Sequence, residues 1–373
     1  MKNLKNLILI VCLFPGCLAS AQVFEQVRHT SDRFDPEQNE LFEILFSLNL
    51  PARVVLKWYD DREMLVSRVS VPGMLPAGEH KMFWDGKDLT GNALPNEAYH
   101  YVLVAETANG EEQVFDLTDT VEDEFIEVKS IDYDPDEKII SYRIDRKARV
   151  NIRIGLRDNG PLLRTLVNWV PRTDGENQEN WDGKDQDGLL DLLEHPNLSF
   201  WIQAYPLSKN TILVGVDTNK SEYASSDLVQ GKRSVGRIRK KKMYAHMQQP
   251  AESRNDFDLK LEVVGVEPES ASGVYNVQAG RVPIRLEAKK KDRARAYRRR
   301  LEPVFYVDGV FAFETEVGYL PMVWSWNTKN APAGLHYVTV NVRGYEGNFG
   351  VATIRVKIMQ KQSEDAHAPM RGK

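Results

Sequence analysis

The sequence predicts an all-β protein in which several β-sandwich domains follow one another along the chain. One observation is a five-residue motif that occurs twice, at equivalent places in two long stretches of similar sequence. A second is the alternation of apolar and polar residues in short segments, which are bounded by Gly, Pro, Asn and Asp. A third is that the chain has hardly any helical periodicity. Together these observations favour tandem sandwiches.

The repeated motif is Trp84-Asp85-Gly86-Lys87-Asp88, which returns 97 residues later as Trp181-Asp182-Gly183-Lys184-Asp185. The match continues on both sides of the motif at the same spacing. It pairs Gly78 with Gly175, Leu65 with Leu162, and Gly91 with Gly188. The chain therefore contains two tandem copies of one domain.

The motif predicts a tight turn beside a buried tryptophan. Gly accepts the positive φ that such turns require, and Asp can hydrogen-bond its own backbone. Trp84 closes an alternating strand, so we expect its indole to fill the core next to the turn. Catalysis by Asp85 and Asp88 is the alternative, but carboxylates in a repeated turn are typical of a structural role. We assign that role to Trp84, Asp85, Gly86, Asp88, Gly91, Trp181, Asp182, Gly183, Asp185 and Gly188.

A longer pattern surrounds the first motif. An apolar strand at 52–58, a short strand at 65–69, the motif, Gly91 and then Tyr99-His100-Tyr101 follow in that order. This order resembles the Ig-like domain of the bacterial flagellar hook-capping protein, and the resemblance covers roughly residues 30–217. It departs at Ala98, where the family favours Gly. The resemblance implies a non-enzymatic sandwich of the Ig-like or fibronectin-III-like type.

Residues 1–21 predict a secretory signal peptide. Two lysines precede an apolar run from Leu7 to Phe14, and Ala19-Ser20-Ala21 provides a cleavage site. The run is too short to span a membrane, so we expect no transmembrane segment after signal removal. Lipid anchoring at Cys17 is the alternative, but Phe14-Pro15-Gly16 matches a lipobox poorly. We therefore expect a secreted or periplasmic protein, with association to the cell surface as a further option.

Both cysteines, Cys12 and Cys17, lie in this segment. The exported chain would then have no disulfide, no thiol chemistry and no cysteine-bound metal. The length fits about three domains, and the formal net charge of −5 mainly favours solubility.

We predict two Ig-like domains of the hook-cap type, at residues 30–120 and 125–217. Acidic residues of the second domain raise the hypothesis of a calcium site, because calcium takes several carboxylate oxygens. An EF-hand starting at Asp132 fails because Glu137 and Arg143 stand at its conserved Gly and Glu positions. Asp185, Asp187 and Glu194 fit a second candidate loop, but Gly183 occupies its first ligand position. We interpret this segment as an Asp-rich turn and leave calcium binding there as an open alternative.

Residues 218–256 have the composition of a flexible linker, rich in Ser, Asn, Gln, Lys and Arg. Basic residues cluster at 232–233 and 237–242. Such a cluster could attract an anionic partner, for example an envelope polysaccharide or lipid headgroups. Nucleic acid fits least, because export is predicted and the cluster has no interleaved aromatics.

We predict a third Ig-like domain at residues 257–360 and a disordered tail at 361–373. Several segments alternate at strand period, and Asp308-Gly309 predicts a hairpin turn. The segments at 323–328, 333–336 and 347–350 resemble a different branch of bacterial Ig-like domains.

The third domain contains the candidate binding residues. Trp324 and Trp326 share one face of a strand, where they would either fill the core or offer a platform for sugar rings. A charged stretch between two strands is too polar for burial and predicts a projecting basic loop. Its candidate binding residues are Lys289, Lys290, Lys291, Arg298, Arg299 and Arg300.

We find no catalytic signature in the sequence. No His pair has the spacing of helical zinc proteases, and no G-x-S-x-G or phosphate-binding Gly-rich motif occurs. We predict a non-enzyme without cofactor or metal: an exported structural or adhesive protein that binds a protein or glycan of the cell envelope. The alternatives are a carbohydrate-binding protein, or an accessory assembly factor of an extracellular appendage or secretion machine.

Overall fold

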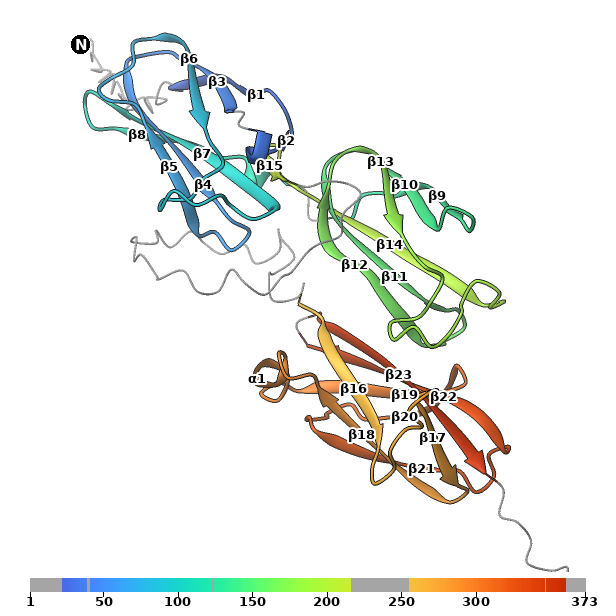
Figure 1. The fold of residues 1–373 in the computed structure, drawn as a ribbon. Coiled ribbons are helices and arrows are strands. Elements are labelled where there is room, and N and C mark those ends of the chain that lie inside the picture. The colour runs from blue at the N-terminus through green and yellow to red at the C-terminus, as the bar shows by residue number, and fades with distance from the viewer. Residues whose placement is uncertain (1–21, 39–40, 122–123, 216–254, 346, 360–373) are drawn as a thin grey trace, which may run out of the picture.

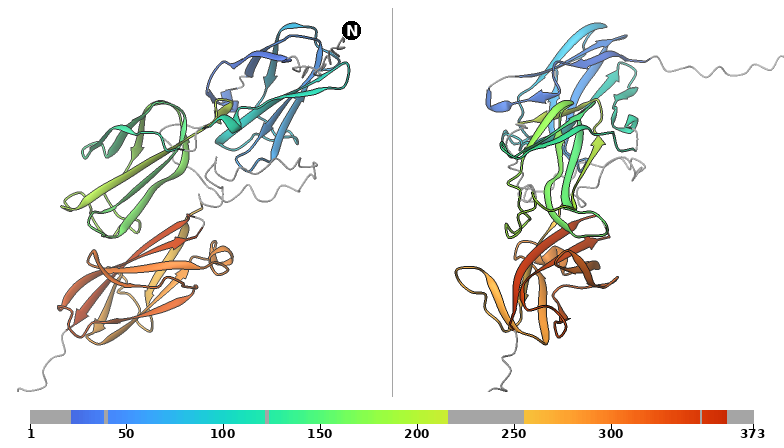
Figure 2. Two further views of the ribbon diagram at one scale, coloured as in Figure 1. Left: turned by 180° about the vertical axis from the view of Figure 1, so that it is seen from behind. Right: turned by 90° about the vertical axis from the view of Figure 1, so that its right-hand side faces the viewer.

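The computed structural model describes residues 22–38, 41–121, 124–215, 255–345 and 347–359. The predicted signal peptide, nearly all of the predicted linker and the tail lie outside these residues. The described chain forms three β-sandwich domains in a bent row, with the second between the first and the third (Figures 1 and 2). The predicted fold class, all-β with tandem Ig-like sandwiches, is confirmed. Among the described residues, no helix is long and apolar enough to cross a membrane.

The first domain consists of strands from residues 24–115 and one strand that follows the second domain. Its strands are β1 (Phe24–His29), β2 (Arg33–Phe34), β3 (Phe42–Leu48), β4 (Ala52–Tyr59), β5 (Leu65–Ser70), β6 (Gly78–Trp84), β7 (Glu97–Thr107), β8 (Glu112–Phe115) and β15 (Thr211–Val214). One sheet has the order β1-β3-β6, and the other has the order β2-β15-β7-β4-β5 with β8 paired to β7. Every second residue of β3 and β4 is buried, as expected for strands with one face on a core.

The strand β15 joins the first two domains. It pairs antiparallel with β7 and parallel with β2, so both of its edges are hydrogen-bonded within the first domain. Ile212 and Val214 are fully buried in the core of that domain. The sequence assigned residues 125–217 to the second domain, whereas the structure places β15 in the first. The same core also includes Phe24, which precedes the predicted boundary at residue 30.

The second domain packs two three-stranded sheets, β13-β10-β9 and β12-β11-β14. Their strands are β9 (Lys129–Asp134), β10 (Ile139–Ile144), β11 (Ala148–Leu156), β12 (Leu162–Arg172), β13 (Gly175–Asn180) and β14 (Leu198–Pro206). Its core contains Trp181, which packs against Tyr133 and Phe200. In the first domain the equivalent Trp84 stacks instead on Trp58, with ring centroids 3.9 Å apart.

The third domain is a sandwich whose two layers are linked by one strand. It contains β16 (Phe257–Val263), β17 (Val274–Gln278), β18 (Arg281–Ala288), α1 (Arg293–Ala296), β19 (Leu301–Val307), β20 (Val310–Glu314), β21 (Met322–Asn327), β22 (Gly334–Gly344) and β23 (Phe349–Met359). β16 pairs antiparallel with β18 in one layer and parallel with β23 in the other. β20 is an edge strand that pairs with β19 alone.

Buried charges hold the first and second domains together. Nη2 of Arg149 on β11 lies 2.8 Å from Oε1 of Glu97 on β7, and both side chains are almost fully buried. Lys147 donates to Oδ1 of Asp32 at 2.5 Å and to the carbonyl oxygen of Thr211. Buried ions are tolerated only when paired, so these contacts fix the angle between the two domains.

The second and third domains meet through backbone and side-chain contacts. The Asn341 side chain accepts from the backbone N–H of Leu162 at 2.8 Å and donates to its carbonyl at 2.7 Å. The backbone N–H of Thr353 donates to Asp187 at 2.8 Å. The guanidinium of Arg153 lies 3.8 Å from the ring centre of Phe349. These contacts therefore fix one relative position of the second and third domains.

Replacing Glu97 by Ala should destabilise the first two domains strongly. The Arg149 guanidinium would stay buried, with Asp61 at 4.0 Å as its nearest described carboxylate. Breaking a buried ion pair from one side typically costs about 3–5 kcal/mol. The matched control is Glu176→Ala, which removes the exposed partner of Arg143 and should cost less than about 1 kcal/mol. Urea unfolding measures the loss of unfolding free energy in both variants. Equal losses would contradict the assignment of Glu97 and Arg149 as a stabilising buried ion pair.

The His336–Asp308 pair should make the third domain sensitive to pH. Burial favours the neutral ring of His336, but its hydrogen bonds with Asp308 (2.6 Å) and the Pro332 carbonyl (2.8 Å) outweigh this and raise its pKa. A raised folded-state pKa adds stability that is complete below the ordinary pKa of about 6.5 and is lost as pH rises through the folded value. The test variant is Asp308→Asn, which removes the carboxylate charge. Asn suits the left-handed φ of 51° at this position.

The melting-temperature gap between the wild type and Asp308→Asn should therefore be wider at pH 5.5 than at pH 9. Thermal unfolding followed by circular dichroism measures it. A gap that does not change with pH would show that the pair adds no charge-dependent stability.

Candidate functional site

The two copies of the repeated motif have the same local geometry. Trp84 is 1% exposed, and its Nε1–H donates to the carbonyl of Lys87 at 3.1 Å. Trp181 is also 1% exposed, and its Nε1–H donates to the carbonyl of Lys184 at 2.9 Å. Each indole therefore fills a core and ties the following turn to it.

The motif carboxylates bind the backbone of their own turns. Oδ1 of Asp85 accepts the N–H of Lys87, and Oδ1 of Asp182 accepts that of Lys184. The second aspartates do the same one turn later. Asp88 accepts the N–H groups of Thr90 and Asn92, and Asp185 accepts those of Leu189 and Leu190. These contacts are those of turn-forming residues, and each pair lies within its own domain.

Glycine is required in these turns by backbone conformation. Gly86 and Gly183 have φ of +75° and +80°, while Gly91 and Gly188 have φ of +86° and +69°. Side-chain-bearing residues rarely adopt these values. At Gly86 a Cβ atom would also lie 2.6 Å from Cβ of Pro36.

The structure gives no support to the calcium hypothesis. Within the described ranges, no three His, Cys, Asp or Glu residues cluster so as to hold a metal ion, and Asp185, Asp187 and Glu194 accordingly form no such group. Asp185 is fully buried and bonds its own turn, whereas Asp187 accepts from Thr353 of the third domain. The Asp-rich turn thus shapes a loop and a domain junction.

Trp324 and Trp326 belong to the core, which corrects the hypothesis of a sugar platform. They are 8% and 7% exposed. Trp324 packs against Phe305 and Phe313, and Trp326 meets His336 edge to face. Neither indole presents an open ring face on which a sugar could stack. The sequence left this undecided because a strand has two faces and the spacing of the two residues does not say which is buried.

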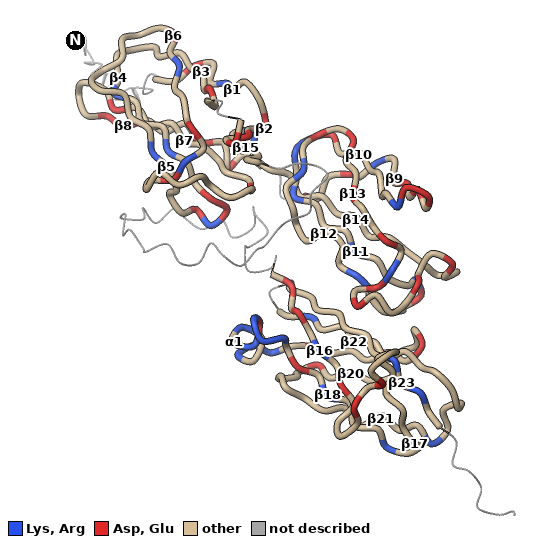
Figure 3. The backbone as a smooth tube through the Cα atoms, in the orientation of Figure 1, with Lys and Arg blue, Asp and Glu red and all other residues tan. Residues whose placement is uncertain are grey.

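The predicted basic loop connects β18 to β19 and includes α1 (Figure 3). Asp292 accepts the backbone N–H of Asp258 at 2.8 Å. Arg295 donates to Asp292 and to the carbonyls of Asn255 and Asp256, and its guanidinium lies 4.7 Å from the Phe257 ring centre. The loop therefore has a defined conformation.

Five of the six candidate residues of this loop are exposed. They are Lys289, Lys290, Lys291, Arg298 and Arg300. Arg299 is half-buried and donates to Oδ1 of Asn348 at 3.2 Å, so it also supports the loop. Lys291 lies 2.7 Å from Asp258, and this hydrogen bond raises its pKa.

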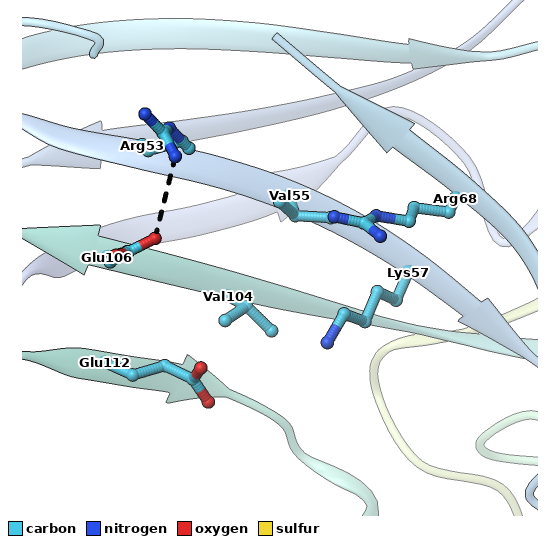
Figure 4. A pocket seen from close by; sticks show the side chains of 7 residues that line it. All are labelled: Arg53, Val55, Lys57, Arg68, Val104, Glu106 and Glu112. Atoms are coloured by element: carbon cyan, nitrogen blue, oxygen red, sulfur yellow. Dashed lines mark ion pairs between the residues drawn. The ribbon is translucent and has the colours of Figure 1, made fainter. Parts of the chain in front are cut away.

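A shallow hollow of about 170 Å³ lies on the outer face of the first domain (Figure 4). Strands β4, β5, β7 and β8 line it with Arg53, Val55, Lys57, Arg68, Val104, Glu106 and Glu112. Sequence analysis missed this surface, because each residue alone looks like part of a solvated strand face. A second hollow at the junction of the first two domains has only about 20 Å³, room for about one water molecule.

The edge strand β20 exposes large apolar side chains. Val310 is 68% and Phe311 is 54% exposed. The nearby loop adds Val317 and Tyr319 at 50% and 54%. An exposed apolar edge can accept another strand.

No family model and no curated protein matches the chain. Among solved structures, it is similar to FlgD from P. aeruginosa, with 26% identity over 26% of this chain and 73% of that one, at a TM-score of 0.21. The fibronectin(III)-like modules of Clostridium thermocellum CbhA match at 11% identity over 92% and 100%, with a TM-score of 0.21. A 1.5-MDa bacterial ice-binding adhesin matches at 12% over 88% and 95%, with a TM-score of 0.18. Scores this low carry no conclusion about family or function.

Replacing Gly86 by Ala should cost more stability than replacing Gly91 by Ala. Both changes place a side chain in the left-handed region, at about 1–2 kcal/mol each. Gly91 has open space around the added atom, whereas Gly86 meets Pro36 and Phe34. That overlap should add about 1–3 kcal/mol. Chemical unfolding of the two variants measures the difference, and equal effects would contradict the proposed packing of the turn.

Proposed function

We propose that this chain is an exported, non-catalytic structural or adhesive protein that binds a component of the bacterial cell envelope. It would do so through surfaces of its sandwiches and through the basic loop of the third domain. The observation that carries the proposal is an ordered loop that holds six exposed cations at one place, five of them among the predicted binding residues. Export rests on the signal peptide expected from the sequence.

The loop has the properties of a binding surface. Its own contacts, through Asp292 and Arg295, hold it against the sandwich, so little conformational entropy is lost when a partner binds. Most of its cations extend into solvent, where they attract anionic groups at a range set by the salt concentration. An anionic glycan or an acidic protein surface of the envelope fits this chemistry.

The absence of catalysis is part of the same proposal. The motif carboxylates bond their own turns, and the two hollows are shallow or very small. The edge strand β20 offers an additional contact for a partner strand. The resemblance of residues 30–217 to the hook-capping Ig-like domain also supports an extracellular scaffold, and it is the support for the alternative of an assembly factor.

Replacing Lys289, Lys290, Lys291, Arg298 and Arg300 with Ser should weaken binding to isolated cell envelopes several-fold at low salt. The reason is the loss of a local positive potential, so the difference should shrink as salt rises. Arg299 is kept because it supports the loop. Co-sedimentation of the purified chain with envelope fragments over a salt series measures the effect.

The matched control neutralises as many exposed cations, spread over all three domains. It changes Lys81, Lys129, Arg143, Lys329 and Lys357 to Ser. This variant should bind nearly as well as the wild type. If both variants bind alike, total charge rather than the loop governs retention, and the proposal fails.

A further inference from the structure

The outer face of the first domain carries two pairs of like charges. The register of β4 and β5 places Lys57 directly opposite Arg68, and that of β7 and β8 places Glu106 directly opposite Glu112. Like charges in directly opposite positions destabilise a sheet. The two pairs have opposite signs and lie on one face, which we call the mixed-charge face.

The cationic pair has no partner within the described chain. Neither Lys57 nor Arg68 has a carboxylate oxygen within 4.0 Å among the residues that the structure describes. At the acidic end, Glu106 lies 4.0 Å from Arg53, and both side chains are more than half exposed. No carboxylate of the described residues therefore offsets the repulsion between Lys57 and Arg68.

An apolar row separates the two ends. Val55 lies opposite Val104, which lies opposite Val114, so the row crosses three strands. Val114 is 45% exposed, and the hollow of about 170 Å³ lies over Val55 and Val104. Figure 4 shows Val55 and Val104 between Lys57 and Arg68 on one side and the two glutamates on the other.

This pattern selects against partners of uniform charge. A polyanion or an anionic membrane attracted to Lys57 and Arg68 would be repelled by Glu106 and Glu112. A polycation attracted to the two glutamates would be repelled by Lys57 and Arg68. A partner that fits has an apolar centre with a negative and a positive end. The mixed-charge face itself has that pattern.

We propose that the mixed-charge face binds a second copy of this chain. A two-fold axis in the plane of the interface, set across the direction from the basic to the acidic end, places each end of one copy against the opposite end of the other. The valine rows then meet at the centre. The glutamates of the other copy then relieve the repulsion between Lys57 and Arg68.

The size of the face makes this dimer weak. Strands lie about 4.8 Å apart and alternate residues of a strand about 6.6 Å apart, so the patterned area is about 300–400 Å² per copy. A standard stable interface buries about 800 Å² per partner. We therefore expect dimers at concentrations of about 100 μM or more at low salt, and fewer as salt rises.

Two charge-reversed variants test the proposal. Lys57→Glu with Arg68→Glu makes both ends of the face acidic, with Arg53 still paired to Glu106, and Glu106→Lys with Glu112→Lys makes both ends basic. Each variant alone should be monomeric, whereas an equimolar mixture should form a one-to-one complex. The variant with all four changes restores opposite ends and should self-associate again. Sedimentation velocity over a concentration and salt series measures all four samples beside the wild type.

A substitution at the apolar centre that leaves the charges unchanged tests the proposal even if the charge-reversed variants misfold. Val114→Ser leaves the charges in place on an exposed edge position and should reduce self-association several-fold, with an unchanged circular dichroism spectrum. A wild type that stays monomeric at several hundred μM in low salt overturns the proposal. So does a mixture that forms no complex, or charge-reversed variants that self-associate like the wild type. None of these results depends on the basic loop, whose envelope binding is tested by separate substitutions.

Discussion

The fold of the first two domains depends on a hydrogen bond between a buried indole and the carbonyl three residues further along the chain. In each of the first two domains this bond makes the tryptophan serve two purposes, because the ring fills the core while its N–H fixes the turn that leaves the core. The aspartates and positive-φ glycines then complete the turn, and the next strands start in the correct register. Since both copies keep this arrangement, the neighbours of the indole are free to differ. The ring packs on Trp58 in the first copy and on Tyr133 and Phe200 in the second.

The arrangement of the domains depends on one strand of the middle sandwich. The inward residues of β11 form a core, while of its outward residues Arg149 is buried and Arg153 is half-buried. Arg149 meets Glu97 of the first domain, and Arg153 meets Phe349 of the third. One strand thus contacts both neighbours through alternate residues of a single face. The strand β15, which returns to the first domain, adds a backbone connection that side-chain contacts alone would not provide.

Much of the local structure could be predicted from the sequence, because it rests on short-range chemistry. The turn at Asp85-Gly86 and the burial of Trp84 follow from conformational preference and strand alternation. That β15 belongs to the first domain could not be predicted, since its partners on β7 lie more than a hundred residues earlier. Alternation also cannot say which face of a strand is covered, so Trp324 and Trp326 stayed ambiguous. The sequence could not predict the mixed-charge face, because its residues come together only when four strands pair in register.

Because contacts between the domains hold them in one arrangement, the separation of the two candidate surfaces has a functional consequence. The mixed-charge face belongs to the first domain and the basic loop to the third, so the two surfaces lie on different outer domains of the row (Figures 1 and 3). The buried contacts of the middle domain oppose any folding of one end onto the other, so the two surfaces remain available to separate partners. A weak contact between first domains would then join two basic loops in one particle. Two weak electrostatic contacts on one envelope act together, because the second forms at a high effective concentration once the first has formed. Under the proposed function, weak individual surfaces on a rigid frame would thus be sufficient for retention at a densely charged envelope.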